Sequence, residues 1–311
     1  MRIAFFGSGE FGLPTLFALK ESHHKIALVV TAPPKPSGRG RRLTTTPVAH
    51  AALELGLETL APEDPNSQEF LQQFQNYAPQ CGVVIDYGYI LKEPLLKIPQ
   101  HGFINLHPSL LPRYRGAAPI PRQIMDGCTK TGLTVFALDT GVDTGDILNQ
   151  IEIPIQPDET CGELKTRLGQ IGAQLVVKTL NQIETGSVKR QEQNHALATK
   201  APKLTKSDRV IVWNKPAQEI HNLIRALSPE PGAITSFRGR QLTVLRSRVL
   251  NEYINSDPGT IITEKSGVMV ATTHGLLELL QIKPAGGKVL SGADFRNGYR
   301  PSPGERLGDN Q

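Results

Sequence analysis

Three polar residues, Asn105, His107 and Asp143, have types and spacing that suit chemistry in this 311-residue sequence. Asn105 and His107 are two positions apart in the apolar run Phe103–His107, so on a strand their side chains point to the same side. Asp143 follows the next strand-like run, Leu133–Asp139, after a Thr-Gly-Val turn, and can therefore lie beside His107. An amide, an imidazole and a carboxylate on two neighbouring strand ends suit acyl transfer without a metal or a covalent intermediate.

Each of these side chains has a role in moving an acyl group to an amine. The Asn105 amide can donate to the oxyanion of the tetrahedral intermediate, where a preorganised donor is worth roughly 3–4 kcal/mol. His107 has the pKa range for moving the proton, and a carboxylate at Asp143 would raise that pKa and fix the tautomer. We expect these residues to be catalytic. We expect no metal, because His107 is the only imidazole close in sequence to Asp143 and Asp146.

The elements that must position these residues alternate between strands and helices as far as about residue 183. Apolar runs indicate strands, and apolar residues at helical spacing indicate helices. Strands are expected at Arg2–Phe6, Ile26–Thr31, Cys81–Asp86, Phe103–His107 and Leu133–Asp139, and helices at Pro14–Lys20, Val48–Leu55, Gln68–Gln75, Ile120–Asp126 and 160–183. This alternation predicts an α/β domain with a Rossmann-like, open and largely parallel sheet, whose carboxyl edge binds ligands.

The pattern changes near residue 189, and the length of the chain fits two domains. We expect a catalytic domain at 1–188, a polar and basic interdomain linker at 189–207, and a second domain at 208–311. In the second domain a helix at Pro216–Leu227 precedes short strand-like runs. These are Ala233–Phe237, Leu242–Val249, Gly259–Thr263, Gly267–Thr272 and Leu276–Ile282. Short strands at this spacing predict a small β-barrel of the oligonucleotide-binding (OB) type.

The placement of charge says more than the net charge of +5. One basic segment, Pro33–Arg42, contains no acid, and a second runs through 189–206. Basic loops of this kind suit a phosphate backbone. The three cysteines are far apart, which favours a reducing compartment and gives no disulfide or metal framework. The apolar N-terminal run is too short for a signal peptide or membrane span, so we expect a cytoplasmic protein.

A glycine motif at Gly7–Gly12 matches G-x-G-x-x-G between a strand and a helix, as in dinucleotide-binding turns. The rest of that fingerprint is missing. The second strand ends in Thr31 and Ala32, not in an acid for a ribose hydroxyl, and Glu10 would repel a pyrophosphate. We interpret the motif as a tight turn. An NADP-binding oxidoreductase that uses Arg39 or Arg41 remains an alternative from a different class.

The run Asn105-Leu106-His107-Pro108-Ser109-Leu110-Leu111-Pro112, followed by Asp143-Thr144-Gly145-Asp146, resembles the signature of folate-dependent formyltransferases. This resemblance implies 10-formyltetrahydrofolate as the formyl donor and the catalytic roles given above. It also implies folate contacts from Ser109, Leu110, Leu111, Pro112, Tyr87, Gly88, Tyr89 and Ile90. A fixed turn beside the folate suits a cis Leu111–Pro112 peptide bond, which the sequence alone does not determine.

Over nearly its whole length the sequence is similar to the methionyl-tRNA formyltransferase family, notably in Arg113–Ile120, Ala201–Lys206 and Ile224–Pro229. This similarity implies that the amino group of initiator methionyl-tRNA attacks the formyl donor directly, and we expect a monomer. The residues expected to contact tRNA are Arg39, Arg41, Arg42, Lys203 and Lys206. Gly9, Gly12, Asp86 and Glu230 depart from the family pattern.

Other acceptors and functions stay open from the sequence alone. An amino-sugar-nucleotide formyltransferase, or the hydrolase portion of a formyltetrahydrofolate dehydrogenase, can carry a similar barrel. A glycinamide ribonucleotide formyltransferase needs no such domain, so the length of the chain argues against it. A non-catalytic RNA-binding module is a further alternative, and it predicts that substitution of His107 leaves cellular function intact.

Overall fold

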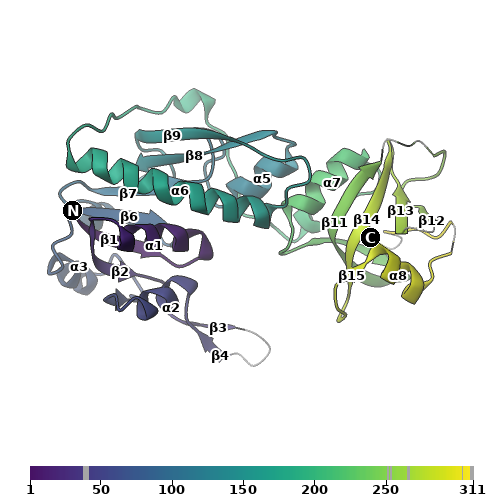
Figure 1. The fold of residues 1–311 in the computed structure, drawn as a ribbon, viewed down its shortest axis with the longest axis horizontal. Coiled ribbons are helices and arrows are strands. Elements are labelled where there is room, and N and C mark those ends of the chain that lie inside the picture. The colour runs from purple at the N-terminus through teal and green to yellow at the C-terminus, as the bar shows by residue number, and fades with distance from the viewer. Residues whose placement is uncertain (38–41, 251, 253, 265–266, 303, 309–311) are drawn as a thin grey trace. The chain divides into compact units, whose positions relative to one another are not determined.

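The chain forms two compact units in the computed structural model, which describes residues 1–37, 42–250, 252, 254–264, 267–302 and 304–308 (Figure 1). The first unit comprises Met1–Gly116, Thr131–Ile153 and Lys165–Ala201. The second comprises Ala117–Lys130, Pro154–Leu164 and Pro202–Gln311. Within the described ranges, no helix is both long enough and apolar enough to cross a membrane.

A seven-stranded sheet forms the centre of the first unit, in the order β5-β2-β1-β6-β7-β8-β9. The strands are β1 (Arg2–Gly7), β2 (Lys25–Val30), β5 (Thr59–Leu60), β6 (Cys81–Ile85), β7 (Phe103–His107), β8 (Lys130–Ala137) and β9 (Ile147–Pro154). Strands β5, β2, β1, β6 and β7 run parallel, whereas β8 is antiparallel to β7. The predicted Rossmann-like, largely parallel sheet is confirmed.

Helices surround this sheet, and a hairpin extends from it. They are α1 (Leu13–Glu21) after the 3₁₀ turn η1 (Glu10–Gly12), α2 (Pro47–Glu54), α3 (Gln68–Gln75), α4 (Glu93–Leu96) and α6 (Cys161–Glu184). The hairpin consists of β3 (Lys35–Ser37) and β4 (Arg42–Thr44). The sequence gave no prediction for this hairpin or for α4. The capping box that begins α6 is confirmed, since Thr160 N–H donates to Glu163 Oε2 at 2.9 Å and Glu163 N–H to Thr160 Oγ1 at 3.3 Å.

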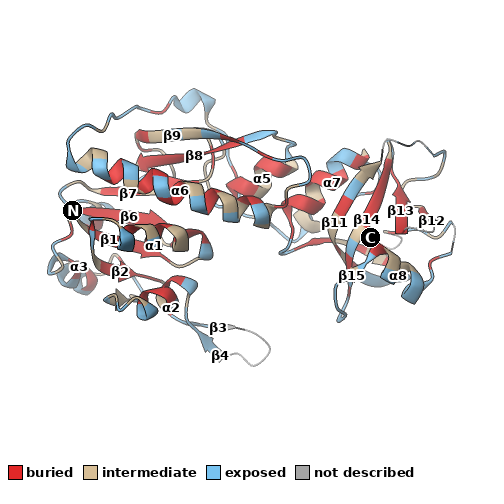
Figure 2. Ribbon diagram, in the orientation of Figure 1, coloured by how far each residue is buried: buried red, intermediate tan, exposed pale blue. Residues whose placement is uncertain are grey.

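An aromatic cluster fixes one face of the sheet. Phe70 and Phe74, one turn apart on α3, pack with Phe6 of β1 and Phe103 of β7. The Phe6 ring lies 5.5 Å from the Phe74 ring and 5.3 Å from the Phe103 ring. On the opposite face Leu106 lies against Gly172 of α6, where a Cβ would overlap the leucine. Alternation along β7 therefore turns Asn105 and His107 away from α6, and Figure 2 shows the central strands buried.

The order of the strands creates a switch point between β1 and β6. Strand β1 has β2 on one side and β6 on the other. The strands that come after β1 in the sequence are therefore added first on one side of it, as β2 and β5, and then on the other side, from β6 onward. In open α/β sheets, ligands bind in the crevice beyond the carboxyl ends of the strands at such a point. The segments after Gly7 and after Ile85 therefore flank a natural ligand site.

The second unit contains an antiparallel sheet that closes on itself. Its strands follow the order β10 (Ala233–Phe237), β11 (Arg240–Leu250), β14 (Leu276–Pro284), β13 (Gly267–Ala271) and β12 (Ile261–Glu264), and β15 (Leu290–Ser291) pairs with β14. Residues 305–308 join the two edges. Leu307 N–H donates to Gly259 O at 2.8 Å, and Gly308 N–H donates to Ser236 O of β10 at 3.0 Å. The predicted small β-barrel is confirmed.

Helices complete the second unit. Helix α5 (Pro119–Met125) packs on α7 (Ala217–Ala226), and α8 (Gly292–Tyr299) packs on β13 and β14. The sequence predicted α5 and α7. It gave no prediction for α8, β15 or, in the first unit, β9.

Candidate active site

His107 ends β7 in a nearly closed environment, with 5% of its surface exposed. Its Nε2 lies 2.9 Å from the carbonyl oxygen of Tyr114. A carbonyl can only accept, so Nε2 carries the proton and Nδ1 of the neutral ring keeps its lone pair. Burial lowers the pKa of His107 below its ordinary value, and the opposing effects of Asp143 and the Tyr114 carbonyl do not outweigh it. The ring is therefore neutral near pH 7.

Asp143 faces the unprotonated nitrogen of this ring. Its Oδ2 lies 3.6 Å from His107 Nδ1 and accepts a hydrogen bond from Gly116 N–H at 2.8 Å. The structure thus brings these two predicted residues together. It corrects one part of their assignment, because the Tyr114 carbonyl, and not Asp143, fixes the tautomer of the neutral histidine.

The route of the chain to Asp143 also differs from the prediction. We expected Asp143 to follow a strand that ends at the same edge as β7. Strand β8 is antiparallel to β7, and its last residue, Ala137, pairs with Ile104 near the start of β7. The loop after Ala137 then has to return toward the end of β7, so Asp143 reaches His107 through loop structure and not through a neighbouring strand end.

Gln193 holds this loop, and the sequence gave no sign of its role. It is 3% exposed, and its Nε2 donates to the carbonyl oxygens of Asp143 at 3.0 Å and Gly145 at 2.7 Å. Its Oε1 accepts from Arg115 Nε and Nη2 at 3.2 and 2.6 Å. Gln193 lies in the polar segment that we predicted as a linker, where nothing distinguishes it from the glutamine at 191.

A second contact ties the same polar segment to the loop that follows β7. Thr199 Oγ1 accepts from Tyr114 N–H at 2.8 Å, and Thr199 O accepts from Arg115 N–H at 2.9 Å. These bonds fix the position of the Tyr114 carbonyl, which in turn orients His107.

Asn105 lies two residues before His107, half-buried, and pairs with Val84 of β6. The alternation described above places its side chain on the same side of the sheet as that of His107. The three predicted catalytic residues therefore come from one strand and from the loop that lies over its end.

The loop Ser109–Pro112 is anchored through its own side chains. Ser109 is fully buried and donates to Arg113 O at 2.6 Å, and Leu111 packs against Phe136 and Ile147. Leu110 occupies the space next to Gly132. The Leu111–Pro112 peptide bond is cis. These contacts make the loop rigid, and they direct the Ser109 and Leu111 side chains into the protein.

A hollow of about 460 Å³ lies at the switch point between β1 and β6. It is lined by Ser8, Gly9, Ala32, Lys35, Asp86, Tyr87, Gly88 and Tyr89. Its size is in the range of small-molecule sites. It includes Tyr87, Gly88 and Tyr89 of the predicted folate segment 87–90, and the remaining residue of that segment, Ile90, is 72% exposed. Tyr87 packs edge-on against Phe6, and burial raises the pKa of its hydroxyl group.

Gly9 and Asp86, two of the residues that we expect to depart from the family pattern, lie against each other in this hollow. Gly9 lies directly against the Asp86 carboxylate, and a Cβ at Gly9 would overlap it. Gly9 N–H also donates to Asp86 O at 3.1 Å, and Lys165 Nζ lies 3.6 Å from Asp86 Oδ2. The aspartate is accommodated because residue 9 has no side chain. The motif glycine therefore serves packing, as expected of a tight turn.

The predicted tRNA contacts are placed only in part. Arg39 and Arg41 lie outside the described residues, and Arg42 begins β4 of the hairpin. Lys203 and Lys206 belong to the second unit and are exposed. Close to them Arg122 forms a paired contact with the Asp208 carboxylate, with both N···O distances 2.9 Å. This contact lowers the pKa of Asp208.

Comparisons with known proteins show the family to which the chain belongs. Residues 1–180 match the model of the formyl transferase family, and residues 203–300 match that of the formyl transferase C-terminal domain. The methionyl-tRNA formyltransferase of Roseiflexus sp. (strain RS-1) is 42% identical over 99% of this chain and 96% of its own length. That of Carboxydothermus hydrogenoformans is 43% identical over 98% of this chain and 99% of its own.

Among solved structures, an N-formyltransferase from Helicobacter canadensis, in complex with folinic acid and dTDP-3-aminofucose, superposes with a TM-score of 0.68. It is 19% identical and covers 90% of this chain and 99% of its own. At this level of identity the match shows a common fold.

Proposed function

Because this chain belongs to the methionyl-tRNA formyltransferase family, we propose that it transfers the formyl group of 10-formyltetrahydrofolate to the amino group of methionyl initiator tRNA, for translation initiation. The observation that carries the proposal is identity of about 40% with these enzymes along essentially the whole chain, both units included. The geometry at the carboxyl edge of the sheet supports the same reaction.

The mechanism is direct attack of the amine on the formyl carbon. In the tetrahedral intermediate the former carbonyl oxygen carries negative charge, which the Asn105 amide stabilises. The neutral His107 ring takes the proton that the amine loses and passes it to the leaving N10 of the folate. The imidazolium that forms lies between the Tyr114 carbonyl at 2.9 Å and the Asp143 carboxylate at 3.6 Å, and both favour its charge.

The folate binds at the carboxyl edge between the hollow and the Ser109–Pro112 loop. Tyr87, Gly88, Tyr89 and Ile90 form one wall, and the second wall is provided by Ser109, Leu110, Leu111 and Pro112. Support comes from the position of the hollow at the switch point, next to β7. The reaction needs no metal among these residues.

The tRNA contacts the basic residues of the hairpin and of the second unit. In the sequence Arg39 and Arg41 lie between β3 and β4, Arg42 is the first residue of β4, and Lys203 and Lys206 precede the barrel. We assign 1–188 as the catalytic domain, 189–207 as the basic linker and 208–311 as the tRNA-binding barrel. The enzyme acts as a monomer in the cytoplasm, where initiator tRNA is charged and used.

An acceptor competition tests the proposal. Purified protein receives labelled 10-formyltetrahydrofolate with methionyl initiator tRNA, glycinamide ribonucleotide or an amino-sugar nucleotide in separate reactions. We expect label on the tRNA alone. Label that appears only on the amino sugar would overturn the proposal in favour of the alternative acceptor. Failure to bind or use the folate at all would favour the oxidoreductase or the non-catalytic RNA-binding protein.

The basic hairpin has its own test. Arg41→Ala should raise KM for the tRNA while folate binding stays unchanged, because the residue meets a phosphate backbone and not the donor. Equal losses for tRNA and folate would instead indicate a folding defect, and the Arg41 assignment would fail.

A further inference from the structure

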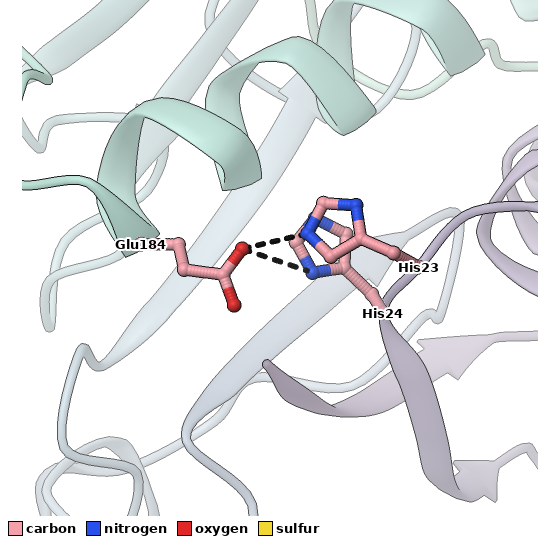
Figure 3. Close-up of side chains that lie close together, drawn as sticks. All are labelled: His23, His24 and Glu184. Carbon is pink, nitrogen blue, oxygen red and sulfur yellow. Dashed lines mark hydrogen bonds and ion pairs between the residues drawn. The ribbon is translucent and has the colours of Figure 1, made fainter.

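A second group of histidines with a carboxylate lies in the first unit, away from the proposed active site. His23 and His24 occupy the turn between α1 and β2, and Glu184 is the last residue of α6 (Figure 3). His23 Nε2 lies 2.7 Å from Glu184 Oε2, and His24 Nδ1 lies 3.9 Å from the same oxygen. The sequence suggested no comparable context for either histidine, because some 160 residues separate them from Glu184.

The lone pair of His24 is directed into this group. His24 is fully buried at its side chain, and its Nε2 lies 2.9 Å from Asn181 Oδ1, one turn before Glu184 on α6. The amide oxygen accepts, so Nε2 carries the proton and the lone pair of Nδ1 is an acceptor for a cation, a place that the α-amino group of Met1 takes at 3.0 Å. A hydrogen bond from the second ring nitrogen of this kind commonly orients histidine ligands of metals.

Electrostatics at this place also favour a cation. The C-terminal end of a helix carries a partial negative charge, and a carboxylate there is unfavourable without a positive partner. Glu184 ends a 24-residue helix, and hydrogen bonds from His23 and the α-amino group of Met1 lower its pKa to about 2. That amino group donates to Glu184 Oε1 at 2.7 Å and lies 3.0 Å from His24 Nδ1. Glu184 and His24 Nδ1 thus already bind one cation, the ammonium group of Met1.

We propose that His23, His24 and Glu184 form a binding site for a divalent transition metal, with Zn²⁺ the best match. Two imidazole nitrogens and a carboxylate oxygen are borderline donors that suit Zn²⁺ and disfavour Mg²⁺ or Ca²⁺. The donor atoms lie within 4.8 Å of one another. Donors in a tetrahedral zinc site are about 3.3 Å apart. The His23–Glu184 distance must therefore widen and the His24–Glu184 distance must shorten, each by less than an ångström.

The metal takes the place of the Met1 ammonium on these acceptors. The amino group either loses a proton and becomes the fourth ligand or gives that position to water. His23 and Glu184 can adjust to the metal, because their side chains are 60% and 36% exposed, whereas His24 is held. His24 is also fixed through its backbone, since its N–H donates to Ser22 Oγ at 3.1 Å.

The site joins elements at the amino edge of the sheet. Met1 precedes β1, His24 precedes β2, and Glu184 ends the helix that packs on β7. The proposed active site lies at the opposite edge of the same parallel strands. Metal binding should therefore raise the stability of the folded unit by mass action and leave formyl transfer unchanged.

Zinc titration of full-length, chelator-treated protein without an affinity tag tests the proposal. We expect one Zn²⁺ per chain and a Tm that rises with Zn²⁺ concentration. Co²⁺ should give the absorption bands of tetrahedral coordination, and Mg²⁺ should have no effect. His23→Ala and Glu184→Gln should each raise the Kd for Zn²⁺ at least about tenfold.

His50→Ala is the matched control, because His50 is an exposed histidine whose Nδ1 lies 3.6 Å from Glu54 Oε2 and forms no three-donor group with the residues that the structure describes. It should bind Zn²⁺ like the unchanged protein. Circular dichroism of the metal-free variants shows whether they fold, and the exposed positions of His23 and Glu184 make folding the expected result. Absence of binding tighter than millimolar in the unchanged protein would overturn the proposal. Equal affinity in all variants would do the same.

Discussion

Two groups that each combine histidine with a carboxylate lie at opposite edges of one sheet and differ in almost every other respect. At the carboxyl edge, the side chains of His107 and Asp143 are 6% and 16% exposed, and their nearest charged atoms are 3.6 Å apart. At the amino edge, Glu184 is 36% exposed and lies 2.7 Å from His23. The residue types are the same, so the surroundings must decide what each group does.

The difference lies in what else each carboxylate contacts. Asp143 accepts a hydrogen bond from a backbone N–H, in a loop that Gln193 holds in place. It can therefore stabilise the imidazolium form of His107 without a short contact to the neutral ring. Glu184 is paired with a protonated amine and an exposed histidine, and these partners hold it as a carboxylate at any ordinary pH. These contacts suit the first group to the proposed exchange of a proton and the second to the binding of a positive charge.

Substitution of His107 should give the largest difference in kcat between the two groups. His107→Asn should lower kcat for formyl transfer by about 10²–10⁴-fold, the usual worth of a positioned acid–base group. His23→Ala, at the other edge, should leave kcat unchanged. Steady-state kinetics with saturating folate and tRNA provides the measurement. Nearly normal kcat in His107→Asn would show that His107 is no more catalytic than His23.

Asn105 gives the next largest effect. Asn105→Ala should lower kcat by about 10²–10³-fold, because the oxyanion loses its donor. The KM values should change little, since the amide acts on charge that develops only in the transition state. A raised KM with normal kcat would assign Asn105 to substrate binding instead.

Gln193 tests whether the loop around Asp143 depends on its support. Gln193→Ala removes the donor to two carbonyl oxygens and one of the acceptors of the Arg115 guanidinium, and it should cost about 1–3 kcal/mol of stability. We expect kcat/KM to fall by about tenfold as Asp143 loses its position. The neighbouring exposed residue provides the control, since Glu192→Ala should change neither quantity.

The smallest effect concerns acid stability at the amino edge. The pKa of Glu184 is lowered in the folded protein to about 2 from 4.5, so its contribution to stability is present above about pH 4.5 and is lost as pH falls toward 2. The difference in Tm between the unchanged protein and Glu184→Gln should therefore be larger at pH 6 than at pH 3. A difference that does not vary with pH would show that the carboxylate charge has no part in this contact.

Much of the fold followed from local patterns, because strands and helices with regular apolar spacing carry their own signal. Strand β7, with Asn105 and His107 near its end, belongs to this class, whereas Asp143 reaches His107 through a loop that the pattern did not predict. The direction of β8 does not belong to it, because β8 is buried on both faces and its continuous apolar run is typical of a parallel strand, although it runs antiparallel to β7. The connection before it contains the short helix α5, and this helix packs on α7 of the second unit.

The supporting contacts of the site could not be read from the sequence for a different reason. The tautomer of His107 depends on a backbone carbonyl, which has no sequence signature. Gln193 is a glutamine among polar residues, and only the folded loop shows that it is buried. His24 and Glu184 are distant in the chain, and only the packing of α6 brings them together.

The way the chain alternates between the two units has a consequence for recombination. The second unit takes Ala117–Lys130 and Pro154–Leu164 from the middle of the first, so no single cut separates them. A fragment that ends near residue 200 would keep α5 without α7, and the barrel alone would keep α7 without α5. An exchange of acceptor specificity between relatives therefore has to transfer three stretches of sequence together, which makes the barrel a poor interchangeable module.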